Sequence, residues 1–253
     1  MTGVEENTVE GFEIFTYGDA VADVFDGTGW AGDPGDTEET IEWLAENAGG
    51  GPVLELGVGT GRVAVPLARR GIEVHGIDAS EGMLTQLRDK PGGELVHVHV
   101  QDFTDFTLPY KFSLAYAVFD TLPFITDQEE QIRCFRKVAD VLEPGGRFVI
   151  QTSIPDPARY DRNQRTQTVR VEKDHVVMTF TRRERISQCS SIQFAVLRPD
   201  GIRFFPMRIR TVMPSEMDLM ARLGGLTMES RWGHWDGRPL RDSDERHITV
   251  YRK

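Results

Sequence analysis

The sequence predicts an α/β fold: a mostly parallel sheet with helices on both faces, carrying an antiparallel β insertion. Three observations favour this fold. From Val53 onward, short apolar segments alternate with helix-forming segments, a pattern typical of a parallel sheet. A glycine-rich turn directly follows the first apolar segment. Between about residues 166 and 212, extended runs separated by turn residues replace this alternation, which predicts the inserted sheet.

The elements of the parallel part follow from start and stop signals. Asp36 is the expected N-cap of a first helix, with Glu39 three residues on as in a capping box, and a run of glycines ends that helix. Pro66 fits a helix only in the first turn, where its missing N–H costs no hydrogen bond. Strands are expected at residues 53–56, 73–77, 95–100, 112–119 and 147–151, and helices at 63–70, 81–88 and 128–142.

The insertion and the closing elements come next. Alternation of period two, as in Val176, Met178 and Phe180, marks the strands of the insertion. A helix is then expected at residues 214–222, where two glycines soon follow. Two closing strands are expected at residues 226–231 and 246–251.

Composition and charge narrow the range of possible partners and locations of the protein. The 253 residues carry a formal net charge of -11, which repels phosphate backbones, so we expect no nucleic-acid partner. The basic stretch at residues 182–185 is interpreted as a solvated strand face. Cys134 and Cys189 show no metal-ligand spacing, and neither a disulfide nor a zinc site is expected. The acidic N-terminus lacks a signal-peptide core and no apolar run approaches a bilayer span, so we expect a cytoplasmic protein without a membrane partner.

The turn after the first strand has the spacing Gly57-x-Gly59-x-Gly61. Glycines permit a tight turn and close approach of a ligand, and the following helix offers free N–H groups. In open parallel sheets, ligands bind beyond the carboxyl ends of the strands, where this turn lies. Arg62 stands where a dinucleotide fingerprint has its third glycine, which argues against a pyrophosphate. Glu55 would also repel phosphate, and it suits an ammonium group.

Two further carboxylates follow neighbouring strands. Asp78 ends the second strand, where a carboxylate can accept both ribose hydroxyls. Asp102 ends the third strand and can accept the exocyclic amine of adenine, with Phe103 near the ring. A turn-capping role is the alternative for Asp102. Together these residues predict a site for an adenosine that carries a cation and no phosphates.

These segments together resemble the core of class I S-adenosylmethionine-dependent methyltransferases. The glycine turn is similar to that family's first motif, Gly76-Ile-Asp78 to its second, Gln101-Asp102-Phe103 to its third, and the turn at residues 142–146 to the one before its fifth strand. The resemblance covers about residues 37–152, and residues 214–252 fit the family's last helix and hairpin. It implies a Rossmann-like sheet of seven strands, the last antiparallel, with S-adenosylmethionine as donor and S-adenosylhomocysteine as product.

The resemblance also implies the site residues. The expected cofactor-binding residues lie in the N-terminal segment and at the strand ends: Tyr17, Glu55, Leu56, Gly57, Gly59, Gly61, Arg62, Asp78, Ala79, Met83, Asp102, Phe103 and Phe119. The expected catalytic residues are Tyr17, Asp120 and His234.

A narrower resemblance concerns the acceptor. The aromatic N-terminal segment, the insertion and residues 233–239 look like bacterial small-molecule methyltransferases, among them the amino-sugar N-methyltransferases of antibiotic biosynthesis. It implies a lid at residues 1–35, a donor-binding domain at 36–152 and 214–253, and an insertion at 153–213 that covers the acceptor pocket. Tyr17 would reach donor or acceptor, and Phe25 replaces a tyrosine common in that group, which argues against a hydroxyl role there.

The expected acceptor is an amine or hydroxyl of a natural-product or sugar intermediate. Phe119 and Asp120 follow the fourth strand, where the acceptor meets the sulfonium, but the paired prolines of nucleic-acid-base methyltransferases are missing. An amine needs little base assistance, whereas a hydroxyl needs a general base, for which Asp120 and His234 are the candidates. The structural alternatives are a turn cap for Asp120 and a packed or surface histidine for His234.

Other interpretations remain open at this point. His97 and His99 share a strand face, but the sequence supplies no further ligands beside them, so we interpret them as structural and expect no metal. A nicotinamide-dependent oxidoreductase is opposed by Glu55 and by the glycine spacing. A protein of this fold that binds the donor without transferring methyl, and a protein or RNA methyltransferase, are further alternatives. The sequence also leaves a homo-oligomer open.

Overall fold

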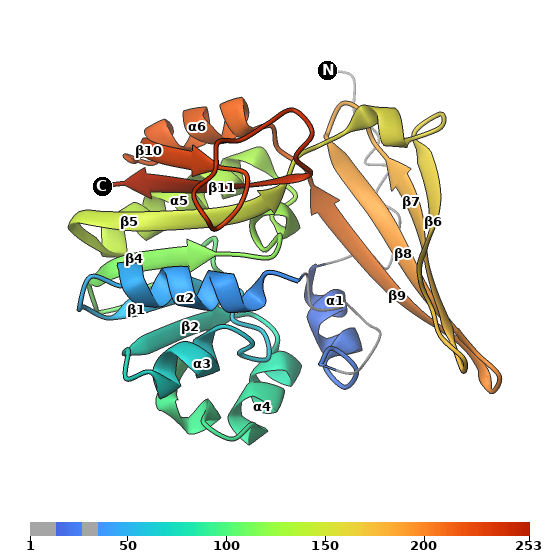
Figure 1. Ribbon diagram of the computed structural model, residues 1–253, viewed down its shortest axis with the longest axis horizontal. Helices are drawn as coiled ribbons and strands as arrows, with labels where there is room; N and C mark the ends of the chain where they lie inside the picture. Colours follow the sequence, from blue (N-terminus) through green and yellow to red (C-terminus); the bar gives the residue numbers. More distant parts are fainter. Residues whose placement is uncertain (1–13, 27–34) are drawn as a thin grey trace, which may run out of the picture.

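The computed structural model describes the backbone of residues 14–26 and 35–253, with side chains from residue 18 onward in the first range. It contains a main sheet and a separate outer sheet (Figure 1). The main sheet has seven strands in the order β10-β11-β5-β4-β1-β2-β3. Their bounds are β1 Val53–Leu56, β2 Val74–Asp78, β3 Val96–Val100, β4 Phe112–Ala117, β5 Leu142–Ser153, β10 Thr227–Trp232 and β11 Arg246–Arg252.

The strand directions confirm the predicted fold class. β1 pairs in parallel with β2 and β4, β2 pairs in parallel with β3, and β4 with β5. β11 runs antiparallel to both of its neighbours, β5 and β10. The sheet is therefore mostly parallel, and its last strand is antiparallel.

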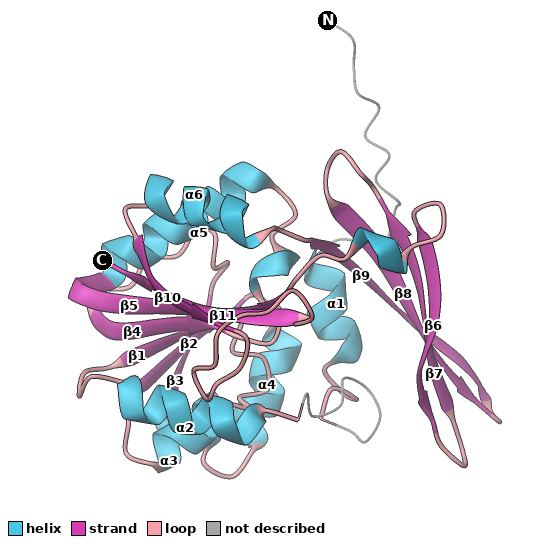
Figure 2. Ribbon diagram, turned by 45° about the horizontal axis from the view of Figure 1, so that its top comes forward, coloured by secondary structure: helices cyan, strands magenta, loops and turns pink. Residues whose placement is uncertain are grey.

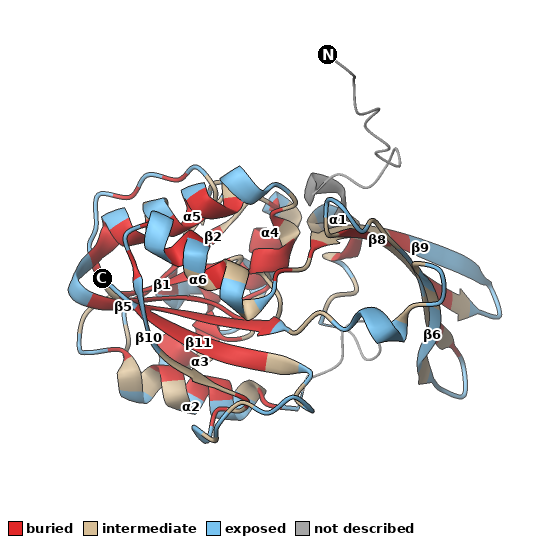
Figure 3. Cartoon of the chain, turned by 90° about the horizontal axis from the view of Figure 1, so that it is seen from above, coloured by how far each residue is buried: buried red, intermediate tan, exposed pale blue. Residues whose placement is uncertain are grey.

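Helices cover both faces of the main sheet. α5 (Gln128–Val141) and α6 (Pro214–Leu223) contribute apolar side chains to the core on one face. α2 (Thr37–Asn47), α3 (Ala64–Arg69) and α4 (Glu81–Asp89) contribute to the core on the other. Figure 2 shows the sheet between these helix layers, and Figure 3 shows that buried residues concentrate in its strands. Because both faces are closed, the carboxyl ends of the strands are the place for a ligand.

The outer sheet is antiparallel, as predicted for the insertion. It consists of β6 (Gln164–Val171), β7 (Val176–Arg183), β8 (Cys189–Arg198) and β9 (Gly201–Arg210), paired in chain order. It stands beside the body that contains the main sheet, with α1 (Ile14–Val21) between the two (Figure 1).

α1 and the turn after it connect the two parts. Arg203 of β9 donates to both carboxylate oxygens of Asp23, at 2.8 and 2.9 Å. On the other side, the hydroxyl of Ser80 at the start of α4 donates to Asp19 at 2.6 Å. Val21 is fully buried in an apolar cluster that also contains residues of α4, β7, β8 and β9. α1 is therefore held from both sides.

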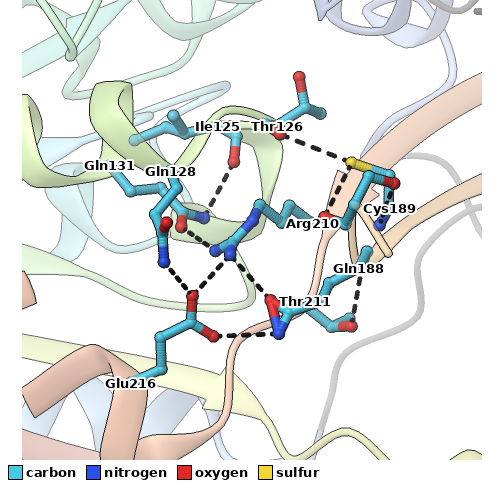
Figure 4. Close-up of polar contacts among 10 residues, drawn as sticks. Ile125, Thr126, Gln128, Gln131, Gln188, Cys189, Arg210, Thr211 and Glu216 are labelled. Atoms are coloured by element: carbon cyan, nitrogen blue, oxygen red, sulfur yellow. Dashed lines mark hydrogen bonds and ion pairs between the residues drawn. The ribbon is translucent and has the colours of Figure 1, made fainter. Parts of the chain in front are cut away.

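A buried arginine makes a second connection, at the end of β9. The Arg210 guanidinium donates to Gln131 of α5 at 2.6 Å, to Gln188 at 2.8 Å and to Glu216 of α6 at 2.5 Å (Figure 4). Its side chain is only 7% exposed. A buried charge is tolerated when it is paired and hydrogen-bonded in this way. The network fixes the outer sheet against the two helices on one face of the main sheet.

The capping box predicted for the first helix is wrong. Asp36 precedes α2, but its carboxylate makes no capping hydrogen bond. Its Oδ2 accepts instead from Gln151 at 2.7 Å and from Arg246 at 2.9 Å. The carboxylate is buried beside β5 and β11, where a charged donor is a stronger partner than a backbone N–H.

Two strand boundaries also differ from the prediction. β4 ends at Ala117 instead of residue 119, because Phe119 and Asp120 have left-handed φ values of 56° and 63°. β5 begins at Leu142, before the glycines expected to precede it, and its pairing with β4 shifts register where they bulge. Pro66 lies in the first turn of α3, as its chemistry requires. Across the described residues, no helix has the length and apolar character needed to span a membrane.

Candidate functional site

A cavity of about 530 Å³ lies at the carboxyl ends of β1, β2 and β4, facing the outer sheet. Its walls come from the glycine turn and the start of α4, the turn after β4, and the outer sheet. The described residues that line it include Gly18, Phe25, Glu55, Gly57, Gly59, Thr60, Arg62, Asp78, Ala79, Ser80, Met83, Phe103, Phe119, Asp120, Thr121, Thr152, Ser153, Gln167, Val169, Thr179, Phe194, Met207, Ile209 and Thr211.

The glycine turn forms the floor of the cavity. Gly57, Gly59 and Gly61 have φ values of 66°, 53° and 79°, which side chains other than glycine rarely adopt. A Cβ atom at Gly57 would stand 2.6 Å from the Thr121 side chain. Among the described residues, no atom would lie closer than 4.0 Å to a Cβ at Gly59, so that backbone is open to a ligand. The turn can therefore present main-chain groups directly to the cavity.

Glu55 is a buried acid at the cavity wall. It is 5% exposed, and burial raises the pKa of its carboxyl to about 8. The Tyr116 hydroxyl donates to its Oε2 at 3.1 Å, and the nearby Arg62 charge also opposes the rise in this pKa. A cation that enters the cavity beside Glu55 would favour the ionised form of this carboxyl and lower its pKa again.

Asp78 organises the loops on either side of it. Its Oδ2 accepts from the N–H of Gly59 at 2.8 Å, and its Oδ1 from the N–H of Ser80 at 2.9 Å. Burial raises the pKa of this carboxyl, and these backbone donors work against the rise. Each oxygen keeps a lone pair that can face the cavity. Asp78 can therefore fix the glycine turn and accept hydroxyl groups of a ligand at the same time.

The turn between β4 and η2 (Leu122–Phe124) has an unusual backbone. Phe119 and Asp120 are both left-handed, and this conformation needs support from neighbours. The N–H of Phe119 donates to the side-chain oxygen of Gln151 at 3.2 Å. The Asp120 carboxylate accepts from the Thr152 hydroxyl at 2.8 Å and from the Ser153 hydroxyl at 2.7 Å. β5 thus holds the turn in place from three consecutive residues.

An arginine packs on the aromatic wall next to this turn. The Arg62 guanidinium carbon lies 4.4 Å from the centroid of the Phe119 ring and 6.0 Å from that of Phe25. Such contacts are cation–π interactions. They join the glycine turn, the β4 turn and the segment after α1 around one side of the cavity.

The outer sheet supplies the opposite wall, which is largely apolar. Val169, Phe194, Met207 and Ile209 line it, and they come from three different strands. Thr179 adds a hydroxyl from the fourth strand. This wall offers no charged side chain among the described residues, so it fits an apolar part of a ligand.

The structure brings most of the predicted site residues together, but not all. Leu56 and Gly61 do not line the cavity: Leu56 is in the core, and a Cβ at Gly61 would stand 2.9 Å from Leu87. Asp102 is exposed outside the cavity, where its Oδ1 accepts from the backbone and the hydroxyl of Thr104. That geometry is the turn-capping alternative.

The other two predicted catalytic residues stand differently toward the cavity. His234 does not line it; this half-exposed side chain lies 3.8 Å from Asp236, next to the buried Trp235. The backbone of Tyr17 lies in α1, but its side chain is outside the described residues. Its neighbour Gly18 lines the cavity.

Comparisons with known proteins agree with this geometry. Residues 53–146 match the methyltransferase domain family. The CcbJ methyltransferase of Streptomyces caelestis is 40% identical, with a TM-score of 0.90 over 95% of this chain and 99% of that chain. The cypemycin N-terminal methyltransferase of a Streptomyces species is 28% identical over 218 residues, 84% of this chain and 88% of that protein. CalS10, an amino pentose methyltransferase of Micromonospora echinaspora solved with S-adenosylmethionine, shares the fold at 22% identity and a TM-score of 0.64, over 86% and 90% of the chains.

The chain therefore belongs to the S-adenosylmethionine-dependent methyltransferases. S-adenosylmethionine is its methyl donor, and the nicotinamide-dependent oxidoreductase is set aside. The cavity fits this donor, because the Glu55 carboxyl in its wall can face a cationic amino group and Asp78 can accept hydroxyl groups.

Proposed function

We propose that the enzyme transfers the methyl group of S-adenosylmethionine to an amine nitrogen of a small-molecule acceptor, a natural-product or sugar intermediate. The observation that carries the choice of an amine is the lining of the cavity. Among the described residues that line it there is no imidazole, and the Asp120 carboxylate already accepts hydrogen bonds from Thr152 and Ser153. A hydroxyl acceptor needs a general base, whereas a neutral amine already offers its lone pair.

Two relatives support an amine acceptor by their names. One is the cypemycin N-terminal methyltransferase. The other is the dTDP-3-amino-3,4,6-trideoxy-alpha-D-glucopyranose N,N-dimethyltransferase of Streptomyces venezuelae, 28% identical over 137 residues, which are 51% of this chain and 56% of that protein. The second name states methylation at nitrogen, and the first names an N-terminus, the chain end that carries the α-amino group.

The donor half of the cavity is proposed to work through its carboxylates. Glu55 receives the ammonium group, and Asp78 receives the ribose hydroxyls with the lone pairs that Gly59 and Ser80 leave available. Phe103 lies against the adenine. Asp102 then contributes by shaping the turn that carries Phe103.

The acceptor half is proposed to lie between the β4 turn and the outer sheet. Residues 153–213 cover this half, and their apolar wall receives the body of the acceptor. Residues 1–35 are proposed as a lid, in which Tyr17 reaches the donor or acceptor; residues 1–13 and 27–34 lie outside the described part. We expect no nucleic acid as acceptor, since the chain carries a net charge of -11.

Methyl transfer requires that donor and acceptor are aligned and that water is excluded. When bound, S-adenosylmethionine supplies a methyl group already activated on its sulfonium. Orientation of this kind contributes up to roughly 7–11 kcal/mol to lowering a barrier. The proposed role of Phe119 is to close the wall beside the reacting centre. Asp120, fixed by Thr152 and Ser153, orients the amine toward the methyl group.

The test compares acceptors that differ only at the reacting group. Pairs of small amino sugars or aminoacyl compounds and their hydroxyl analogues are incubated with enzyme and S-adenosylmethionine, and the addition of one methyl group is followed by mass spectrometry. We expect methylation of the amine member only. Asp120→Asn keeps the shape of the side chain but weakens the hydrogen bonds that fix it, and should lower kcat by about 10- to 100-fold, since misplacing a reacting group has about this effect.

The matched control is Asp105→Asn, because that exposed carboxylate does not line the cavity. It should leave kcat unchanged. Turnover of the hydroxyl member alone, or an Asp120→Asn enzyme as active as Asp105→Asn, would contradict the proposal.

A further inference from the structure

Three imidazoles and a carboxylate gather on the sheet face at the β2–β3 edge, outside the cavity. His75 stands directly opposite His97 in the pairing of β2 with the edge strand β3. Glu73 precedes β2 and points to the same face, because side chains two residues apart in a strand share a face. The sequence alone indicates no further ligands beside His97 and His99. In the fold, Glu73 and His75 lie beside them.

The geometry of this cluster is close to that of a metal site. One ligand atom from each of Glu73, His75 and His97 lies within 4.8 Å of the others. His75 Nε2 is 3.0 Å from Glu73 Oε1. Zinc bonds of about 2.0–2.2 Å to nitrogen and oxygen place tetrahedral ligands about 3.3–3.5 Å apart. Glu73 and His97 are exposed side chains, so small rotations bring all three ligands to that spacing.

The surroundings of His75 supply what a metal-ligating histidine needs. Its Nδ1 lies 3.1 Å from His99 Nε2, so its second ring nitrogen already has an outer partner. The ring is 2% exposed and is covered by Tyr110, at 4.5 Å between centroids, and by Phe112, at 5.2 Å. One ligand is therefore rigid and oriented, while the other two are free to close on an ion.

We propose that Glu73, His75 and His97 bind a divalent transition-metal cation of the Zn²⁺ type, with His99 as the outer partner that orients His75. Two imidazoles and one carboxylate form a donor set suited to such a cation and leave a fourth position for water. None of these residues lines the cavity, and Glu73 lies at the amino end of β2, opposite the donor site. The ion would fasten the edge strand β3 to β2 and take no part in methyl transfer.

The test uses full-length enzyme without a histidine tag. Titration calorimetry with Zn²⁺ should show one equivalent bound, and added Zn²⁺ should raise the Tm. Glu73→Gln and His97→Ala change exposed side chains, so both variants should fold, and each should weaken Zn²⁺ binding at least 10-fold. His99→Ala should weaken it by about 10-fold or more through loss of the outer partner. Methyl transfer should be retained in Glu73→Gln and His97→Ala.

The matched control is His234→Ala, which removes a half-exposed histidine elsewhere on the molecule and should bind Zn²⁺ as the unmodified enzyme does. Absence of Zn²⁺ binding to the unmodified enzyme would overturn the proposal and leave a hydrogen-bonded histidine cluster only. Equal binding by the unmodified enzyme and by the Glu73→Gln/His97→Ala double variant would overturn it as well.

Discussion

Glu55 is the residue on which the proposed recognition of the donor's ammonium group depends. Burial raises the pKa of its carboxyl to about 8, so below that pH the free enzyme holds it protonated. The ammonium group of the donor requires the ionised form. In the proposed site, we therefore expect Glu55 to lose a proton when the donor binds at neutral pH.

The raised pKa of Glu55 leads us to expect that a proton is released when the donor binds. At pH 7, binding of S-adenosylmethionine should release about one proton per site, because the pKa of Glu55 falls when an ammonium group lies beside it. Calorimetry in two buffers of different ionisation enthalpy measures this number. Glu55→Gln should bind the donor at least 10-fold more weakly and release almost no proton. Equal proton release by the variant would show that another group is responsible.

The same residue affects stability in the absence of ligand. The pKa of the Glu55 carboxyl is 4.5 in the unfolded chain and about 8 in the folded chain. The contribution of Glu55 to stability is therefore fully present below pH 4.5 and is lost as the pH rises through 8. Glu55→Gln cannot ionise. The Tm of the variant minus that of the unmodified enzyme should therefore increase from pH 5 to pH 8.5. The increase should be roughly 2–4 °C for each kcal/mol by which ionisation of Glu55 lowers the free energy of unfolding of the unmodified enzyme. A constant Tm difference in differential scanning calorimetry would contradict this account.

At the scale of elements, the turn after β4 depends on β5. Two consecutive left-handed residues, Phe119 and Asp120, are held by the side chains of Gln151, Thr152 and Ser153. Gln151 is itself tied to the buried Asp36. The position of the Phe119 ring thus depends on contacts behind the cavity.

Gln151 is therefore expected to act as a positioning residue. Gln151→Met removes the acceptor for the Phe119 N–H, and kcat should fall by about 10- to 100-fold, the size associated with misplacing a reacting group by about 1 Å. The Kd for S-adenosylmethionine should change much less, since Glu55 and Asp78 are untouched. Steady-state kinetics and calorimetry separate the two effects. An equal loss in both would mean that the donor site itself had collapsed.

The joint between the outer sheet and the helices is a second element-scale feature. Arg210→Met leaves Glu216 without its buried partner and should lower the free energy of unfolding by about 3 kcal/mol. Arg133→Met is the control, because its pair with Glu130 is exposed and should change stability by less than about 1 kcal/mol. Urea denaturation measures both. Similar values for the two variants would show that the Arg210 network does not hold the joint.

At the scale of the whole molecule, the sequence predicts best those parts of the fold and of the site that depend on short local patterns. The main sheet, the antiparallel insertion and the cavity positions of Glu55 and Asp78 follow from strand ends and glycine spacing, which depend on neighbouring residues only. The exposed position of Asp102 does not follow from spacing, because the nearby Thr104 offers its side chain a local partner.

The remaining parts of the site depend on contacts between distant segments. Thr152 and Ser153 support Asp120 from more than 30 residues away, as the pairing of β4 with β5 dictates. The His75 cluster likewise exists only through the register of β2 and β3. No local signal in the sequence identifies such partners.

The central claim is that the donor's methyl group is transferred to nitrogen in the cavity between the β4 turn and the outer sheet. The most direct measurement supplies S-adenosylmethionine labelled with ¹³C at its methyl group and records the ¹³C NMR spectrum of the methylated acceptor. With the unmodified enzyme we expect a single labelled signal at the chemical shift of a methyl carbon on nitrogen. With the Asp120→Asn variant this signal should be absent over the same short reaction time. A labelled signal at the shift of a methyl ether or of a carbon-bound methyl group would contradict it.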